Sequence, residues 1–235
     1  MHRPIALTLI AAALAACAPR SDAAPEPSTA APAADTVYPY RTAVYRCEGD
    51  YGFTALVTLD TADVVPTDAD GTRLFLPERA VMLPHVISAS GARYSDGSIT
   101  YWSKGDHALL EVDGVSRSGC TLDPIWEGAR DRGVTFRATG DEPGWVLELT
   151  PDDSVRFSYD YGEHTVAAPL PELTHNARGF PAYFVKGADF ELNFAIDPRP
   201  CTGTMADEAF ANTVVVTLER GGDFREFHGC GNPVR

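Results

Sequence analysis

Apolar side chains fall at alternate positions in three separate stretches of the chain, residues 53–59, 155–159 and 190–196. A period of two is typical of strands with one buried face. Asp-Gly and Gly-Gly pairs recur at short spacing and supply the positive φ angles of tight hairpins; they stand at residues 70–71, 96–97, 113–114 and 221–222. No helical stripe of ten or more residues is present, although residues 205–211 are expected to form a turn or two of helix. We therefore predict an all-β fold of short antiparallel strands, as in barrels and sandwiches.

A break in this pattern divides the chain. Residues 121–132 contain Pro124, Gly128 and mixed charges, and strand-like alternation resumes at Val134. We predict a first domain over residues 41–121, a linker over residues 122–132 and a second, mainly-β domain over residues 133–235.

The start of the chain is typical of an exported protein. His2 and Arg3 precede an apolar run that ends in Leu14-Ala15-Ala16-Cys17, and this run is shorter than the ~20 residues that a membrane-spanning helix needs. The segment resembles bacterial lipoprotein signals. The resemblance implies that residues 1–16 are a signal peptide and that Cys17 becomes the lipidated first residue. Because Ala18 rather than Asp follows it, we expect an outer-membrane lipoprotein of the cell envelope that faces the periplasm.

Residues 17–40 follow the predicted signal peptide and are rich in Ala, Pro, Ser and Thr. A segment with so few large apolar side chains cannot bury enough surface to offset its loss of entropy on ordering. We predict a flexible tether between the lipid and the folded part.

The predicted mature chain is strongly acidic, with 18 basic and 33 acidic residues and thus a formal net charge of −15 after Arg3 is removed. This excess argues against nucleic acid as a partner, because phosphate contacts need basic patches. It suits a cationic protein partner, and it is equally compatible with the plain solubility of an acidic exported protein.

Four cysteines remain when Cys17 is set aside, and an even number in an exported protein implies disulfides. Four cysteines allow three pairings. The local pairing, Cys47–Cys120 with Cys201–Cys230, gives each half its own disulfide and is the pairing we predict. The chain has no Cys-x-x-Cys and its six His are scattered, so we expect neither a zinc site nor any other metal or cofactor.

Two short motifs lie between Cys47 and Cys120, the segments Ser90–Tyr94 (SGARY) and Ser103–Gly105 (SKG). The first places a hydroxyl on a Gly-containing turn, and the second places a Lys before a Gly. The plain interpretation is a turn and a solvated hairpin tip. The chain has only one other Lys, Lys186, so a lysine at position 104 is a specific feature of this region.

Together with Tyr45-Arg46-Cys47 and the run Tyr101–Gly105, these motifs resemble the family of membrane-bound lysozyme inhibitors of C-type lysozyme over residues 41–121. The family motif SGxxY matches at Ser90, Gly91 and Tyr94. In the second motif, YxxxTKG, Lys104 and Gly105 match and Ser103 replaces Thr, but Ile99 stands at the Tyr position.

The resemblance implies a small antiparallel β-barrel closed by one disulfide, with the two motifs on neighbouring loops that enter the lysozyme cleft. Ser90 and Lys104 would be the inserted side chains, and Gly91, Tyr94, Ser103 and Gly105 would support their loops. Lysozymes cleave with two carboxylates that flank the scissile bond. A hydroxyl can donate a hydrogen bond to one carboxylate and an ammonium can pair with the other, so this pair of residues suits a non-catalytic blocker.

The second half resembles an uncharacterised domain of bacterial envelope proteins that opens with GxEPxW, here residues 140–145, and ends with Gly-Cys-Gly, here residues 229–231. The resemblance implies a fold only. Glu142 is a candidate carboxylate beside Trp145, but a turn position is the better interpretation. His175 and His228 have no nucleophile motif near them, so we predict that the protein is not an enzyme.

Two other functions compete with lysozyme inhibition. One is a non-catalytic envelope lipoprotein that uses the same barrel to bind peptidoglycan, a metal or an assembly partner. The other is a hydrolase that uses Ser90 with Lys104. The sequence predicts no oligomeric state.

Overall fold

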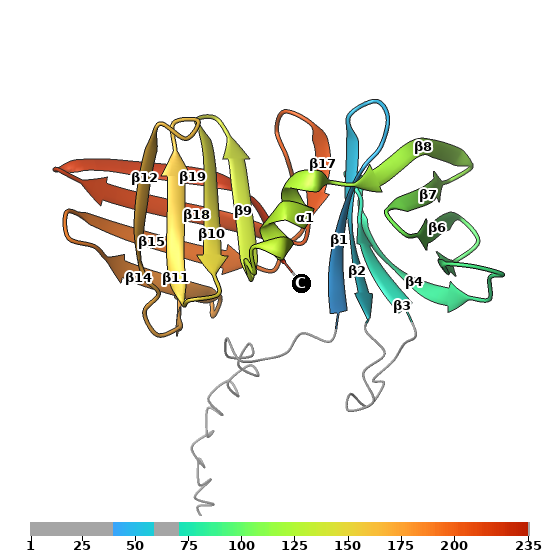
Figure 1. Ribbon diagram of the computed structural model, residues 1–235, viewed down its shortest axis with the longest axis horizontal. Coiled ribbons are helices and arrows are strands. Elements are labelled where there is room, and N and C mark those ends of the chain that lie inside the picture. The colour runs from blue at the N-terminus through green and yellow to red at the C-terminus, as the bar shows by residue number, and fades with distance from the viewer. Residues whose placement is uncertain (1–39, 59–70, 235) are drawn as a thin grey trace, which may run out of the picture. The chain divides into compact units, whose positions relative to one another are not determined.

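The computed structural model describes residues 40–58 and 71–234 (Figure 1). The predicted signal peptide, the predicted lipidation site Cys17 and the predicted tether up to residue 39 lie outside the described residues, as does Asp70 of the first predicted Asp-Gly turn. Among the described residues, no helix has the length and apolar character needed to cross a bilayer.

The first half of the described chain is an eight-stranded antiparallel barrel. Consecutive strands are neighbours from β2 to β8, and β1 closes the ring because it pairs with both β2 and β8. The strands are β1 (Tyr40–Arg46), β2 (Tyr51–Thr58), β3 (Gly71–Phe75), β4 (Ala80–Val86), β5 (Ala92–Ser95), β6 (Ile99–Lys104), β7 (His107–Val112) and β8 (Val115–Leu122). The predicted all-β class and the predicted barrel are confirmed.

The barrel interior is built around packed aromatic rings. Phe53 stacks on Tyr45 with ring centroids 5.1 Å apart, and Tyr101 meets both rings edge-on. The Tyr101 hydroxyl donates to the Tyr45 hydroxyl at 3.2 Å, which satisfies a polar group inside the core. The predicted Cys47–Cys120 disulfide is present beside this cluster.

The second half forms a nine-stranded antiparallel sheet, in the order β12-β11-β10-β9-β19-β18-β15-β14-β13. Its strands are β9 (Phe136–Asp141), β10 (Gly144–Thr150), β11 (Ser154–Tyr159), β12 (His164–Pro169), β13 (Thr174–His175), β14 (Pro181–Lys186), β15 (Phe190–Asp197), β18 (Asn212–Arg220) and β19 (Asp223–Pro233). The alternating residues of 155–159 and 190–196 lie in β11 and β15, and most of their apolar members are buried; Phe157 and Leu192 are fully buried, whereas Ile196 is partly buried. The predicted Cys201–Cys230 disulfide is also present.

Tight turns occur where the Gly-containing pairs predict them. Asp113 and Gly114, between β7 and β8, have φ angles of 50° and 81°. A two-residue hairpin turn of this kind requires positive φ at both positions. Gly221 and Gly222 join β18 to β19 in the same way, with positive φ at both residues.

The expectation of a helix over residues 205–211 is wrong. That segment contains β17 (Asp207–Phe210), which pairs with β16 (Cys201–Thr202) and runs parallel to the start of β2. Its backbone groups are satisfied by these neighbouring strands, and such tertiary pairing overrides a weak local preference for helix.

A helix occurs instead within the predicted linker, as α1 (Pro124–Asp131). Asp123 is its N-cap and accepts a hydrogen bond from the Ile125 N–H at 2.8 Å, while Pro124 occupies the first helical turn. Both features are typical of helix starts. Trp126 and Ala129 are its buried residues. The division into two domains at residues 122–132 stays a prediction.

A buried polar network connects the barrel with the second sheet. Asn232 of β19 is fully buried; its amide donates to the Thr54 hydroxyl at 2.9 Å and accepts from the Ala211 N–H at 2.8 Å. Thr54 of β2 in turn donates to the Ala209 carbonyl at 2.8 Å. Side chains far apart in sequence thus satisfy one another where β2, β17 and β19 meet.

Candidate functional site

The Ser90 turn joins β4 to β5 and is held by hydrogen bonds to its own backbone. Ser88 Oγ donates to the Gly91 carbonyl at 2.9 Å and to the Ser90 carbonyl at 3.3 Å. Ser90 itself is exposed. The turn therefore presents the Ser90 side chain to solvent on a backbone with fixed hydrogen bonds.

Gly91 lets this turn approach the next hairpin closely. Its φ is +69°, and a Cβ atom at this position would lie 2.2 Å from the Ser103 carbonyl oxygen and 3.2 Å from Lys104 Cβ. Only a residue without a side chain fits there without displacement. The first predicted motif thus packs directly against the second.

Lys104 ends β6 and is opposite His107 of β7 across the turn Gly105-Asp106. Gly105 has a φ of +60°. Lys104 is exposed, and no carboxylate among the described residues forms an ion pair with it. The other lysine, Lys186, pairs with Glu191 at 3.0 Å, so the two lysines of the chain have different environments.

Tyr94, which we predict to support the Ser90 turn, lies in the barrel core. It is buried, stacks on Tyr101 with centroids 5.8 Å apart and meets His85 edge-on at 5.4 Å. Ser103 is half-buried and is paired with Ala92 at the start of β5. The supporting roles of Tyr94 and Ser103 stay predictions.

Ile99, which departs from the family motif, is buried in the barrel core at 1% exposure. An apolar residue fits this site, and the neighbouring Tyr101 and Tyr94 already supply aromatic rings. The departure therefore leaves the exposed parts of both motifs unchanged.

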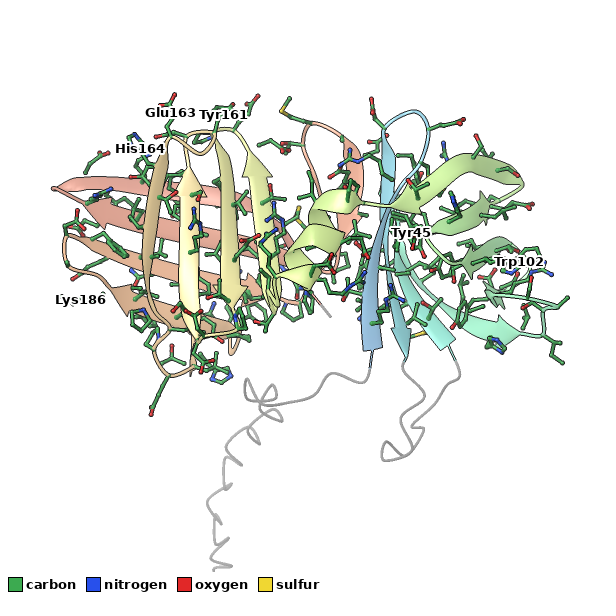
Figure 2. The ribbon with its side chains drawn as sticks, viewed as in Figure 1. Tyr45, Trp102, Tyr161, Glu163, His164 and Lys186 are labelled. Atoms are coloured by element: carbon green, nitrogen blue, oxygen red, sulfur yellow. A yellow bond between two sulfur atoms is a disulfide. The ribbon has the colours of Figure 1, made fainter. Side chains whose placement is uncertain are left out.

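Trp102 has a role that the sequence patterns did not reveal (Figure 2). Its indole Nε1–H donates to the Ser90 carbonyl at 2.8 Å, so a residue of the Lys104 strand holds the Ser90 turn. Across the strands, Arg93 pairs with Trp102 in register, and its guanidinium carbon lies 5.9 Å from the ring centroid. The sequence offered one indication of this role. Trp102 directly follows Tyr101, which points into the barrel, so Trp102 lies on the opposite face of the strand.

A hydrolytic site at these motifs lacks its central contact. No hydrogen bond between the side chains of Ser90 and Lys104 occurs among the bonds of the described residues. A serine nucleophile needs such a bond from its base. Nor do three or more His, Cys, Asp or Glu side chains gather within the described part of the chain in a way that would hold a metal ion.

Glu142 lies in the turn between β9 and β10 and is exposed, whereas Trp145 is buried against Phe157. This agrees with the turn interpretation. His228 contacts the Glu226 carboxylate at 2.8 Å on the exposed side of β19. This contact includes no serine or cysteine that could act as a nucleophile.

Comparison with known proteins gives one family match. Residues 45–117 match the family model described as membrane-bound lysozyme-inhibitor of c-type lysozyme. The match covers β1 from Tyr45 to part of β8, including both motifs, and it ends before α1 and the second sheet.

A curated relative gives the same result. The membrane-bound lysozyme inhibitor of C-type lysozyme from Yersinia enterocolitica serotype O:8 / biotype 1B is 48% identical over 44 residues, which is 19% of this chain and 38% of that protein. No solved structure matches the chain. The barrel segment of residues 45–117, which carries the Ser90 and Lys104 turns, is thus a match to the family of membrane-bound lysozyme inhibitors of c-type lysozyme.

Proposed function

We propose that this protein inhibits C-type lysozyme by inserting Ser90 and Lys104 into the cleft of the enzyme. The observation that carries the proposal is the direct packing of the two motif turns. Gly91 brings the Ser90 turn so close to the end of β6 that a Cβ atom at position 91 would lie 3.2 Å from Lys104 Cβ, while the side chains of Ser90 and Lys104 remain exposed. A hydroxyl and an ammonium group therefore extend from one small area of the barrel.

The chemistry of this pair fits a cleft with two carboxylates. Lys104 has no ion-pair partner among the described residues, so it reaches an acidic cleft without first breaking an internal contact. Ser90 supplies a hydroxyl donor, and its turn is already held by Ser88 and Trp102. Such preorganisation lowers the entropy that binding costs.

We also propose where in the cell the protein acts. The predicted signal peptide and lipidated Cys17 would tether the barrel to the outer membrane, facing the periplasm, where it would protect peptidoglycan. The acidic net charge would favour encounter with a cationic enzyme. The match of residues 45–117 to a family described as membrane-bound supports this location.

The test is a titration of the purified protein against a C-type lysozyme acting on cell walls. We expect stoichiometric inhibition. Truncation of a central interface residue commonly costs about 2 kcal/mol or more, so Ser90→Ala and Lys104→Ala should each weaken inhibition by at least about 30-fold. Lys186→Ala is the matched control, because Lys186 is the other lysine and lies on β14. It should inhibit like the wild type.

Two outcomes would indicate a different function. Absence of inhibition at micromolar protein would discard the proposal in favour of an envelope-binding role. Ester hydrolysis that is lost in Ser90→Ala would support the hydrolase instead.

A further inference from the structure

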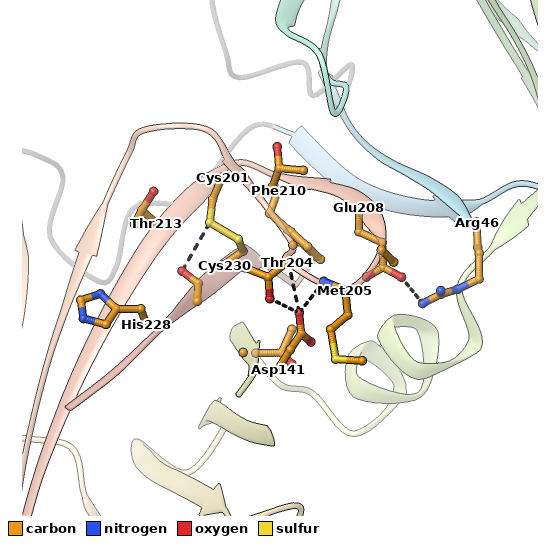
Figure 3. A pocket seen from close by; sticks show the side chains of 16 residues that line it. Arg46, Asp141, Cys201, Thr204, Met205, Glu208, Phe210, Thr213, His228 and Cys230 are labelled. Atoms are coloured by element: carbon orange, nitrogen blue, oxygen red, sulfur yellow. Dashed lines mark hydrogen bonds and ion pairs between the residues drawn. A yellow bond between two sulfur atoms is a disulfide. The ribbon is translucent and has the colours of Figure 1, made fainter. Parts of the chain in front are cut away.

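A cavity of about 360 Å³ lies beside the segment Cys201–Phe210, next to the end of β9 and residues 228–230 of β19 (Figure 3). Its volume is within the range of small-molecule sites. None of the residues that we assign to lysozyme binding lines it. The cavity is therefore a separate feature of the molecule, and a ligand bound in it would be independent of the proposed function.

The cavity has an apolar lining and a loop fixed beside it. The Cys201–Cys230 disulfide, Phe210 and Met205 supply the apolar surface. Asp141 Oδ2 accepts three hydrogen bonds from the loop, from Thr204 N at 3.2 Å, Thr204 Oγ1 at 2.9 Å and Met205 N at 3.2 Å. One carboxylate at the end of β9 thus holds the loop in place, and Figure 3 shows it directed toward Thr204 and Met205.

The charged groups at the cavity are unequal in number. Glu208 pairs with Arg46 at 2.5 Å, and Arg46 also donates to Asp123 at 3.0 Å. Asp141 and Glu208 both line the cavity, whereas Arg46 is the one arginine or lysine in its lining. Burial raises the pKa of Glu208, and the nearby charges of Asp123 and Asp141 add to the rise despite Arg46. Two carboxylates and one guanidinium line the cavity, so its negative charge is only partly neutralised when both carboxylates are ionised.

We propose that this cavity binds a small organic cation, a primary amine on a short apolar stem. The ammonium group would pair with Glu208 and Asp141, and the stem would lie against Phe210, Met205 and the disulfide. An anionic ligand fits poorly, because the single guanidinium of Arg46 already binds Glu208 and Asp123. The size and lining of the cavity define the site, and its charges select a cation.

The test is isothermal titration of the purified protein with 1-aminopentane, and with 1-pentanol and pentanoate as the neutral and anionic probes. We expect saturable binding of the amine, with an affinity at least about tenfold above that of either control. Glu208→Gln should weaken amine binding at least about tenfold. Glu163→Gln, in the exposed turn between β11 and β12, should leave it unchanged.

Thermal unfolding followed by circular dichroism would show whether Glu208→Gln folds. If it does not, Ala206→Phe, which fills the cavity from its loop, provides the second variant and should abolish binding. No saturable binding up to about 10 mM 1-aminopentane, equal binding of the amine and pentanol, or full binding by a folded Glu208→Gln would overturn the proposal. Lysozyme inhibition by these variants should equal that of the wild type, so failure here is distinguishable from failure of the inhibitor proposal.

Discussion

Gly91 is the residue on which the geometry of the proposed inhibitor site most depends. Its φ is positive, and a Cβ atom at this position would lie only 2.2 Å from the Ser103 carbonyl oxygen, which leaves no space for a side chain. Gly97, in the turn between β5 and β6, also has a positive φ, of +95°, but a Cβ there would meet no atom within 4 Å. A side chain at Gly97 would therefore introduce backbone strain alone, whereas a side chain at Gly91 would also clash with neighbouring atoms.

We predict that Gly91→Ala weakens lysozyme inhibition at least about tenfold although Ser90 and Lys104 are intact, because the Ser90 turn must move away from Lys104. Gly97→Ala should cost about 1 kcal/mol of stability through its φ alone and leave inhibition unchanged. Inhibition titrations and urea unfolding of both variants provide the check. Equal inhibition by the two variants would show that the contact between the turns is unimportant.

Trp102 holds the Ser90 turn through one hydrogen bond, which a Phe side chain cannot make. A neutral hydrogen bond contributes about 1 kcal/mol, so Trp102→Phe should weaken inhibition by roughly fivefold while the apolar packing of the ring is largely kept. Trp145→Phe removes a comparable indole bond, to the His228 carbonyl at 3.2 Å in the second sheet, and should not affect inhibition. Comparable losses of inhibition in the two variants would assign Trp102 a merely structural role.

At the scale of single elements, the strands could be predicted because period-two alternation and turn pairs act locally. Residues 53–58, 155–159 and 190–196 are strands as the alternation predicts. Helix α1 was missed because Pro124 and Gly128 suggested a linker. Its start signal was nonetheless present in Asp123-Pro124, an N-cap residue followed by proline. β17 could not be predicted, since its partner β2 is far away along the chain and neither strand's sequence specifies the pairing.

The turn between β5 and β6 depends on Asp96. Its Oδ1 accepts the backbone N–H groups of Ile99 and Ser98, each at 2.8 Å. These hydrogen bonds lower the pKa of Asp96 below its ordinary value of 3.8, and the bond from Ile99 has the largest effect. A carboxylate whose pKa is lowered by folding stabilises the folded state above its unfolded pKa, and this contribution is lost as the pH falls through the folded pKa.

We therefore predict that Asp96→Asn is less stable than the wild type at pH 6 and that the difference shrinks as the pH is lowered below about 4. Urea unfolding at several pH values measures this. Because Asp96 is exposed, the difference should be small and should decrease with added salt. A stability difference that stays constant from about pH 6 to about pH 2 would contradict the assigned cause.

At the scale of the whole molecule, the contact between the barrel and the second sheet is what the sequence least revealed. Ser90 and Lys104 could be singled out because their motifs are short and contiguous. Asn232 could not, because its partners Thr54 and Ala211 become neighbours only in the folded chain. The family match ends at residue 117, whereas the network that satisfies Thr54 of the barrel includes residues far beyond it.

Asn232→Ala should destabilise the protein by more than about 2 kcal/mol, because it leaves the buried Ala211 N–H without its acceptor and removes one of the two hydrogen bonds of the Thr54 hydroxyl. Asn212→Ala is a milder control, since the half-buried Asn212 side chain donates to the Gly231 carbonyl at 3.2 Å. Chemical unfolding followed by fluorescence measures both. Equal, small losses for the two variants would show that the network at Asn232 does not stabilise the fold.

The central claim is that Ser90 and Lys104 occupy the catalytic cleft of a C-type lysozyme. The most direct measurement is the affinity of the protein for such a lysozyme at increasing concentrations of a chito-oligosaccharide that fills the cleft. If the two turns enter the cleft, the apparent Kd must rise in proportion to oligosaccharide concentration, and Lys104→Ala must weaken binding to the free enzyme. An affinity that is unchanged by the filled cleft would place the contact elsewhere on the enzyme and contradict the claim.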